Sequence, residues 1–95
     1  MHYRITKVQH KPGKRDDIVA YLKTKDEDVR SIEGLQSVRM IEISETESIA
    51  ISKYENEQQL TMAEEKFKEI MVGMMPFMTA PPEVNNGDVC WSVQK

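Results

Sequence analysis

The sequence predicts an α+β fold whose elements follow in the order strand, helix, strand, strand, helix, strand. Two observations lead to this prediction. Short runs of β-favouring residues alternate with longer stretches in which apolar residues recur every three or four positions. Turn-forming segments rich in glycine, proline or acidic residues separate these runs. With 95 residues, we interpret positions 1–95 as a single small domain.

The first strand is expected at residues 2–10, "HYRITKVQH", where Pro12 and Gly13 close it with a turn. An amphipathic helix is expected from residue 14 to about residue 32. Gly34 follows it, at the place where a left-handed helix stop requires glycine. The apolar positions of this helix fall three, four or seven residues apart: Ile18, Leu22, Val29 and Ile32.

Residues 36–44, "QSVRMIEIS", and 48–54, "SIAISKY", are two β-rich runs, and the polar "ETE" between them predicts a hairpin. The second helix is expected from Asn56, a good N-cap residue, and Gln59 completes a capping-box pattern. Pro76 lacks an amide proton and crowds the preceding turn, so this helix should end or kink near residue 75.

The last strand is expected in "DVCWSVQ", residues 88–94. The complete order, βαββαβ, is typical of a ferredoxin-like fold, in which two helices cover one face of a four-stranded antiparallel sheet. We expect the helix-facing sheet residues to be Ile49, Ile51, Val89, Trp91 and Val93. The opposite face would then carry small and semi-polar residues: Ala50, Ser52, Tyr54, Cys90 and Ser92. Such a bare face on a small chain predicts a homodimer.

Composition disfavours several partners. The net charge is −3, from 13 basic and 16 acidic residues without a dense basic patch, so nucleic acid is not an expected partner. No apolar run approaches the ~18 residues of a membrane-spanning helix, so a membrane is not expected either. The N-terminal residues lack the pattern of a signal peptide, and a lone Cys90 fits a reducing compartment. We therefore expect a cytoplasmic location.

Features along nearly the whole chain, from Tyr3 to Val93, carry a family resemblance. The first strand runs into "KPGK", and Gly34 stands ahead of "LQSVRMIEI". In "IAISKYENEQQL" an aromatic residue ends the third strand and an acidic, polar helix start follows. In these features the sequence resembles the antibiotic biosynthesis monooxygenase (ABM) domain family of the dimeric α+β barrel superfamily. The resemblance implies a homodimer and a single ABM-like domain.

That superfamily includes cofactor-independent monooxygenases that oxidise quinols or polyketide aromatics, as well as haem-degrading enzymes. The haem-degrading branch uses a histidine on the second helix, and residues 56–75 contain none. We therefore do not expect haem, and the resemblance to cofactor-independent monooxygenases implies no other cofactor. The resemblance implies an ABM-like monooxygenase or small-molecule-binding protein that acts on a hydrophobic aromatic compound. The alternative is a non-catalytic dimeric module that binds or senses a metabolite.

The segment "IMVGMMPFMTAPPEV", residues 70–84, contains four of the seven methionines. Thioethers suit Cu(I), but the segment has no cysteine or histidine, and methionine also fills irregular gaps in cores. We interpret it as the wall of a ligand pocket between the second helix and the sheet, without a metal site. The candidate pocket residues are Met71, Met74, Met75, Phe77, Trp91 and Tyr54.

His10 is the candidate catalytic residue, because histidine titrates near neutral pH and could act as a general base at a pocket mouth. A surface histidine at a strand end is the simpler alternative. Neither His10 nor His2 has a cysteine or carboxylate neighbour at metal-ligand spacing, so we expect no metal site.

Overall fold

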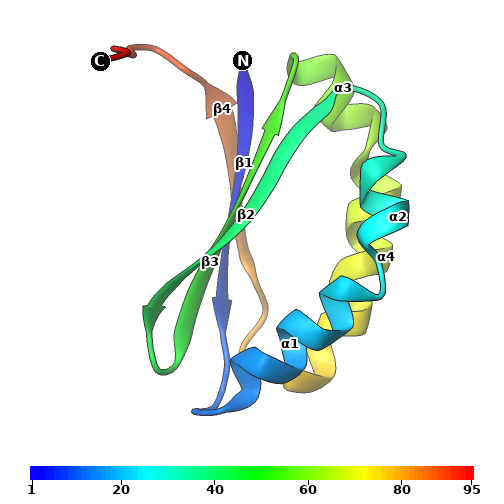
Figure 1. Ribbon diagram of the computed structural model, residues 1–95, viewed down its shortest axis with the longest axis vertical. Helices are drawn as coiled ribbons and strands as arrows, with labels where there is room; N and C mark the ends of the chain where they lie inside the picture. Colours follow the sequence, from blue (N-terminus) through cyan, green and yellow to red (C-terminus); the bar gives the residue numbers. More distant parts are fainter.

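The computed structural model describes residues 1–95 and has the ferredoxin-like α+β architecture that the sequence predicts (Figure 1). Four antiparallel strands form one sheet in the order β2-β3-β1-β4, and the helices lie together over one of its faces. The elements in chain order are β1 (His2–Gln9), α1 (Lys14–Lys23), α2 (Asp26–Arg30), β2 (Leu35–Ser44), β3 (Glu47–Tyr54), α3 (Glu57–Met62), α4 (Glu64–Met74), the 3₁₀ turn η1 (Met75–Phe77) and β4 (Glu83–Asp88).

Local signals for chain reversal and helix ends are confirmed. Gly34 has φ +81°, a left-handed conformation that glycine adopts without strain, and β2 begins at the next residue. The Asn56 side chain accepts a hydrogen bond from the Gln59 amide at 2.9 Å, which is the expected N-cap. The regular helix ends at Met74, and Pro76 lies inside the short turn η1.

Each of the two expected helices is divided in the structure. α1 stops at Lys23 because the amide groups of Thr24 and Lys25 bond to carbonyls three residues back, which tightens the last turn. In the second helix, Ala63 separates α3 from α4. The capping box is only half formed, since the Gln59 side-chain oxygen is buried without a hydrogen-bond partner.

The prediction of the last strand at residues 88–94 is wrong, because the strand lies about one strand length earlier in the chain. β4 pairs with β1 from Glu83, opposite Lys7, to Asp88, opposite His2. β1 begins at His2, so no partner strand remains for residues beyond Asp88, and one bond from the Val89 amide to the Met1 carbonyl ends the pairing. Trp91 consequently has 78 % of its surface exposed and does not lie beneath a helix.

The expected sheet faces on β3 are also inverted. β1 buries His2, Arg4, Thr6 and Val8 beneath the helices. Because paired residues share a face, Ser52 opposite Arg4 and Ala50 opposite Thr6 lie on the helix side. The uncovered face therefore carries the large side chains of Tyr3, Ile5, Ile41, Ile49 and Ile51, together with the charged side chains of Lys7, Arg39 and Lys53. The isoleucines of this face replace the small residues Ala50 and Ser52 that were expected there.

Two buried clusters hold the helices on the sheet. One contains Val8, Ile18, Met71 and Met74, and the other contains Tyr54, Leu60 and Ala63. Together they position α4 along the sheet. No helix in the structure combines the length and the apolar character needed to cross a lipid bilayer.

Candidate functional site

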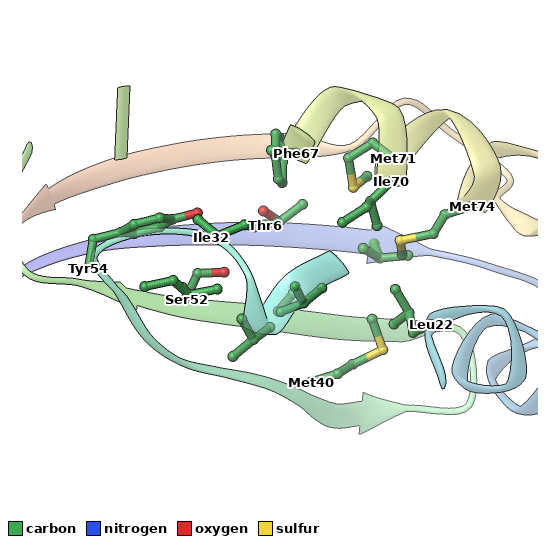
Figure 2. A pocket seen from close by; sticks show the side chains of 15 residues that line it. Thr6, Leu22, Ile32, Met40, Ser52, Tyr54, Phe67, Ile70, Met71 and Met74 are labelled. Atoms are coloured by element: carbon green, nitrogen blue, oxygen red, sulfur yellow. The ribbon is translucent and has the colours of Figure 1, made fainter. Parts of the chain in front are cut away.

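An apolar cavity of about 90 Å³, called here the inner cavity, lies between the covered face of the sheet and the helices (Figure 2). Of its 15 lining residues, 13 are hydrophobic. Met71, Met74 and Phe67 line it from α4. The sheet contributes three residues that carry hydroxyl groups, Thr6, Ser52 and Tyr54. The inner cavity thus has an apolar lining with a few polar side chains, as is usual for small-molecule sites.

A wider space of about 490 Å³, the outer groove, adjoins the inner cavity. Five residues line both spaces, which are Leu22, Val29, Leu35, Val38 and Met40. The rim of the outer groove is polar, with Asp26 and Arg30 on α2 and Gln36 and Ser37 on β2. The inner cavity therefore opens to solvent between α2 and the edge strand β2.

The two volumes limit what can bind. An apolar cavity of ~150 Å³ is known to hold one benzene molecule. The inner cavity, at about 90 Å³, is smaller, whereas the outer groove is several times larger. The inner cavity alone is therefore smaller than a site for one benzene ring, and the two spaces together are larger.

The structure brings together only part of the pocket that the sequence predicts. Met71, Met74 and Tyr54 line the inner cavity. Phe77 packs against the neighbouring core cluster, Met75 is 53 % exposed, and Trp91 lies in the exposed C-terminal segment. Sequence reasoning missed the residues of the opening, because they come from α2 and β2 and not from the methionine-rich segment.

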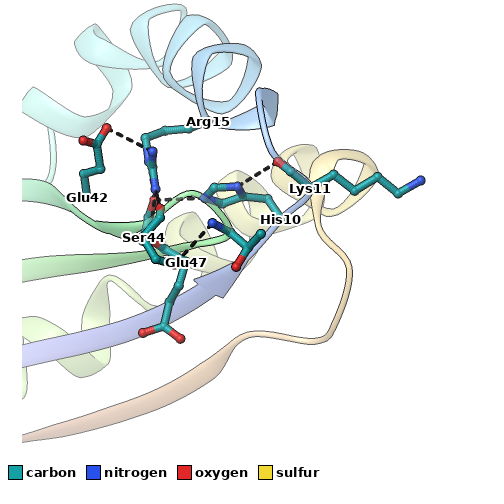
Figure 3. A network of polar contacts seen from close by, with 8 residues as sticks. His10, Lys11, Arg15, Glu42, Ser44 and Glu47 are labelled. Atoms are coloured by element: carbon teal, nitrogen blue, oxygen red, sulfur yellow. Dashed lines mark hydrogen bonds and ion pairs between the residues drawn. The ribbon is translucent and has the colours of Figure 1, made fainter.

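His10 lies outside the lining of the inner cavity. It is 1 % exposed, with Nε2 3.0 Å from the Ser48 hydroxyl oxygen and Nδ1 3.1 Å from the Lys11 carbonyl oxygen. Arg15 donates to the same Ser48 hydroxyl and to Glu42 on β2 (Figure 3). Both ring nitrogens are thus occupied within a network that ties α1 to the β2–β3 hairpin. A catalytic role for His10 stays a prediction.

A buried arginine next to the inner cavity was not anticipated. Arg4 is 1 % exposed and donates to the Tyr54 hydroxyl at 2.9 Å and to Glu64 Oε1 at 2.5 Å. Its guanidinium carbon lies 3.9 Å from the centre of the Phe67 ring, which is a cation–π distance. No sequence motif marks Arg4, because an arginine in a strand usually indicates a solvent-facing position.

Tyr54 is the ionisable group in the lining of the inner cavity. Burial raises the pKa of its hydroxyl above the usual 10.0, and the positive charge of Arg4 opposes this only in part. Tyr54 is therefore a neutral phenol near pH 7. Its proton is free to be donated, since the hydrogen bond with Arg4 uses a lone pair of the oxygen.

His2 joins β1 to β4 at the sheet edge. Its Nδ1 lies 2.6 Å from Asp88 Oδ1 and its Nε2 lies 2.8 Å from Asn86 Oδ1. The hydrogen bond with Asn86, and then that with Asp88, raises the pKa of His2 above 6.5. Glu57 on α3 adds a smaller electrostatic contribution of the same sign.

The raised pKa of His2 predicts a pH dependence of stability. The imidazolium form stabilises the fold, so its contribution is fully present below pH 6.5 and is lost as pH rises through the higher pKa of the folded state. We expect the urea midpoint of the wild type to fall over that window. In His2→Gln this fall should be absent, and an unchanged pH profile in the variant would contradict the assignment.

Comparison with known proteins identifies the fold. No model of a known protein family matches the sequence, and no curated protein does. Among solved structures, a variant of SnoaB, a cofactor-independent oxygenase from Streptomyces nogalater, superposes with a TM-score of 0.82 at 7% identity, over 99% of this chain and 97% of that one. The monooxygenase from the gene ActVA-Orf6 of Streptomyces coelicolor, in complex with the ligand nanaomycin D, gives a TM-score of 0.80 at 15% identity, over 99% and 91%. A putative antibiotic biosynthesis monooxygenase from Nitrosomonas europaea gives a TM-score of 0.79 at 12% identity, over 96% of this chain and 100% of that one. At these identities the likeness concerns architecture, and the chain has the fold of the antibiotic biosynthesis monooxygenases.

Proposed function

We propose that the protein binds a hydrophobic aromatic small molecule between α4 and the sheet. The observation that carries this proposal is the inner cavity itself, which is apolar, has hydroxyl groups on its sheet side and opens between α2 and β2. The ligand complex of the ActVA-Orf6 monooxygenase supports it, because a protein of the same fold accommodates a small molecule. Adaptable methionines suit the wall of such a site.

Oxygenase chemistry on the bound compound is the second candidate, and the likeness to a cofactor-independent oxygenase favours it. In such a reaction a resonance-stabilised carbanion passes electrons to O₂. A ring CH₂ group becomes a carbonyl, one oxygen atom enters the product and the other leaves as water, so the substrate supplies all the electrons. The lining of the inner cavity has no histidine, carboxylate or lysine, and the outer groove adds the single carboxylate of Asp26, so compounds that ionise readily are the candidate substrates. Oxygen uptake with anthrone, with and without protein, distinguishes this reaction from a non-catalytic binding module.

Binding can be tested by closing the opening. Val38 lies at the junction of the inner cavity and the outer groove, so Val38→Trp should fill the entrance. The probe is α-methylstyrene, and the signals are the ¹³C-labelled methyl groups of Met40, Met71 and Met74, which line the inner cavity. We expect saturable shifts in the wild type and binding at least about tenfold weaker in the variant, equivalent to ~1.4 kcal/mol.

Controls for this experiment lie on the same chain. Val72 on α4 is 64 % exposed, and Val72→Trp adds the same side chain outside the lining, so it should leave binding unchanged. The methyl groups of Met62 and Met75, both more than half exposed, report non-specific contact. Shifts spread equally over all labelled methionines, or equal binding by Val38→Trp and wild type, would exclude the cavity as the site.

We further propose that the protein is a homodimer formed through the uncovered face of the sheet. Ile5 and Ile41 on this face are 45 % and 42 % exposed, and Ile49 and Ile51 lie between them on the central part of the sheet. Figure 1 shows no helix on this side. A second copy related by two-fold symmetry would cover the same apolar surface on both chains.

A further inference from the structure

A strong hydrogen-bond donor stands at the sheet side of the inner cavity. Tyr54 lines the inner cavity, and Figure 2 shows its hydroxyl directed toward Thr6. Arg4 NH1 donates to the oxygen of this hydroxyl at 2.9 Å and so fixes its position. Because a phenol has one proton and Arg4 can only donate, the Tyr54 proton is left to point at another acceptor. No acceptor in the protein takes this proton.

The Arg4 guanidinium that donates to Tyr54 is buried more deeply than a purely structural arginine usually is. Arg4 is almost fully buried, and its Nε atom has no hydrogen-bond partner. Burying a guanidinium is costly even with Glu64 as counter-ion, and an unsatisfied nitrogen adds to that cost. Costly buried charges that act on a neighbouring titratable group are found preferentially at functional sites.

Three residues with hydroxyl groups lie on the sheet side of an otherwise apolar lining. Thr6 comes from β1, while Ser52 and Tyr54 lie two residues apart on β3 and therefore share a face. An entirely apolar ligand would leave the Tyr54 proton without an acceptor, at a cost in affinity. A ligand that carries an acceptor oxygen on its ring would satisfy this donor.

We propose that Tyr54, held in place by Arg4, donates a hydrogen bond to an acceptor oxygen conjugated with the aromatic ring of the ligand. The proposal rests on the function proposed above and specifies the chemistry of its ligand. A carbonyl oxygen and a phenolate oxygen both meet the requirement, since each accepts a hydrogen bond in the plane of the ring. The raised pKa of Tyr54 keeps the donor protonated at neutral pH.

A pair of isosteric probes tests the proposal. Acetophenone carries a C=O group where α-methylstyrene carries C=CH₂, so the two differ only in the acceptor oxygen. Affinities are measured from the methyl signals of Met40, Met71 and Met74. In Tyr54→Phe we expect acetophenone to bind about tenfold more weakly, and α-methylstyrene to change by less than about twofold. The ratio of the two dissociation constants is therefore the informative quantity.

Two further variants separate this role from a structural one. Tyr21 donates to the Ile70 carbonyl at 3.0 Å and lies outside the lining, so Tyr21→Phe removes an equivalent hydroxyl and should leave the ratio unchanged. Arg4→Met should lower acetophenone affinity and leave α-methylstyrene affinity unchanged, because the donor loses its orientation. A merely structural Arg4 would weaken both probes alike.

The outcomes distinguish this inference from the function on which it rests. Binding of α-methylstyrene in the wild type, with a ratio that Tyr54→Phe does not alter, would overturn the role of Tyr54 and leave the proposed function intact. If neither probe binds the wild type, both proposals fail. A loss confined to acetophenone in Tyr54→Phe and Arg4→Met, with Tyr21→Phe unaffected, supports the subsite.

Discussion

Ile51→Asp is expected to convert the proposed homodimer into monomers. Ile51 lies at the centre of the uncovered sheet face, opposite Ile5 on β1. In a two-fold interface the substitution occurs twice, and each buried carboxylate costs at least ~2 kcal/mol. The dimer dissociation constant should therefore rise by about a thousandfold or more. The measurement is sedimentation equilibrium, where the subunit mass is 11.0 kDa.

The folded monomer should tolerate this charge. Arg39 is the register partner of Ile51 on β2 and shares its face, so a carboxylate at position 51 gains a neighbouring positive charge. The matched control is Val72→Asp, which places the same charge on the exposed side of α4 and should leave a dimer of the wild-type affinity. A wild type that sediments at the subunit mass at micromolar concentration would exclude this interface.

The parts of the fold that the sequence predicted correctly depend on neighbouring residues. Gly34, the Asn56 cap and the helix end before Pro76 each follow from the conformational limits of a single position. The order of strands and helices follows from local periodicity in the same way. The pairing of strands that are distant in the sequence does not follow from neighbouring residues. The incorrect predictions concern this pairing.

The position of β4 shows the limit most clearly. Residues 83–88, "EVNNGD", have the composition of a loop, whereas residues 88–94 alternate like a strand. Pairing with β1 overrides this preference, because the register places His2 against Asp88 and leaves residues 89–95 without a partner strand. The side chains of His2, Asn86 and Asp88 reinforce that register.

The sequence did not predict which face of the sheet the helices cover, and it therefore misplaced part of the site, for a related reason. Alternation on β3 shows which residues share a face but not which face the helices cover. The covered face of β1 carries His2, Arg4 and Thr6, so the usual rule that polar residues face solvent fails there. Their burial becomes understandable only once Tyr54, Glu64 and Asn86 are in place around them.

Glu64→Ala is expected to destabilise the protein by about 2 kcal/mol. Removing one partner of a buried ion pair costs ~3–5 kcal/mol, because the remaining charge stays buried without compensation. Glu64 is 40 % exposed, so solvent already screens part of its interaction with Arg4. The expected destabilisation is therefore smaller than that for a fully buried pair. The change in free energy of unfolding is measured by urea denaturation. A change below about 0.5 kcal/mol would indicate that solvent compensates the Arg4 charge.

Arg4→Met provides the contrasting result. It removes the buried charge itself and replaces it with an unbranched apolar side chain that can pack against the Phe67 ring. The Glu64 carboxylate left behind is 40 % exposed and can be solvated by water, so we expect a change within about 1 kcal/mol of the wild type. If Arg4→Met unfolds with the free energy of the wild type while Glu64→Ala is destabilised, Arg4 makes no net contribution to the stability of the fold. Its hydrogen bond to the Tyr54 hydroxyl, 2.9 Å away beside the inner cavity, then favours the positioning role proposed for it above.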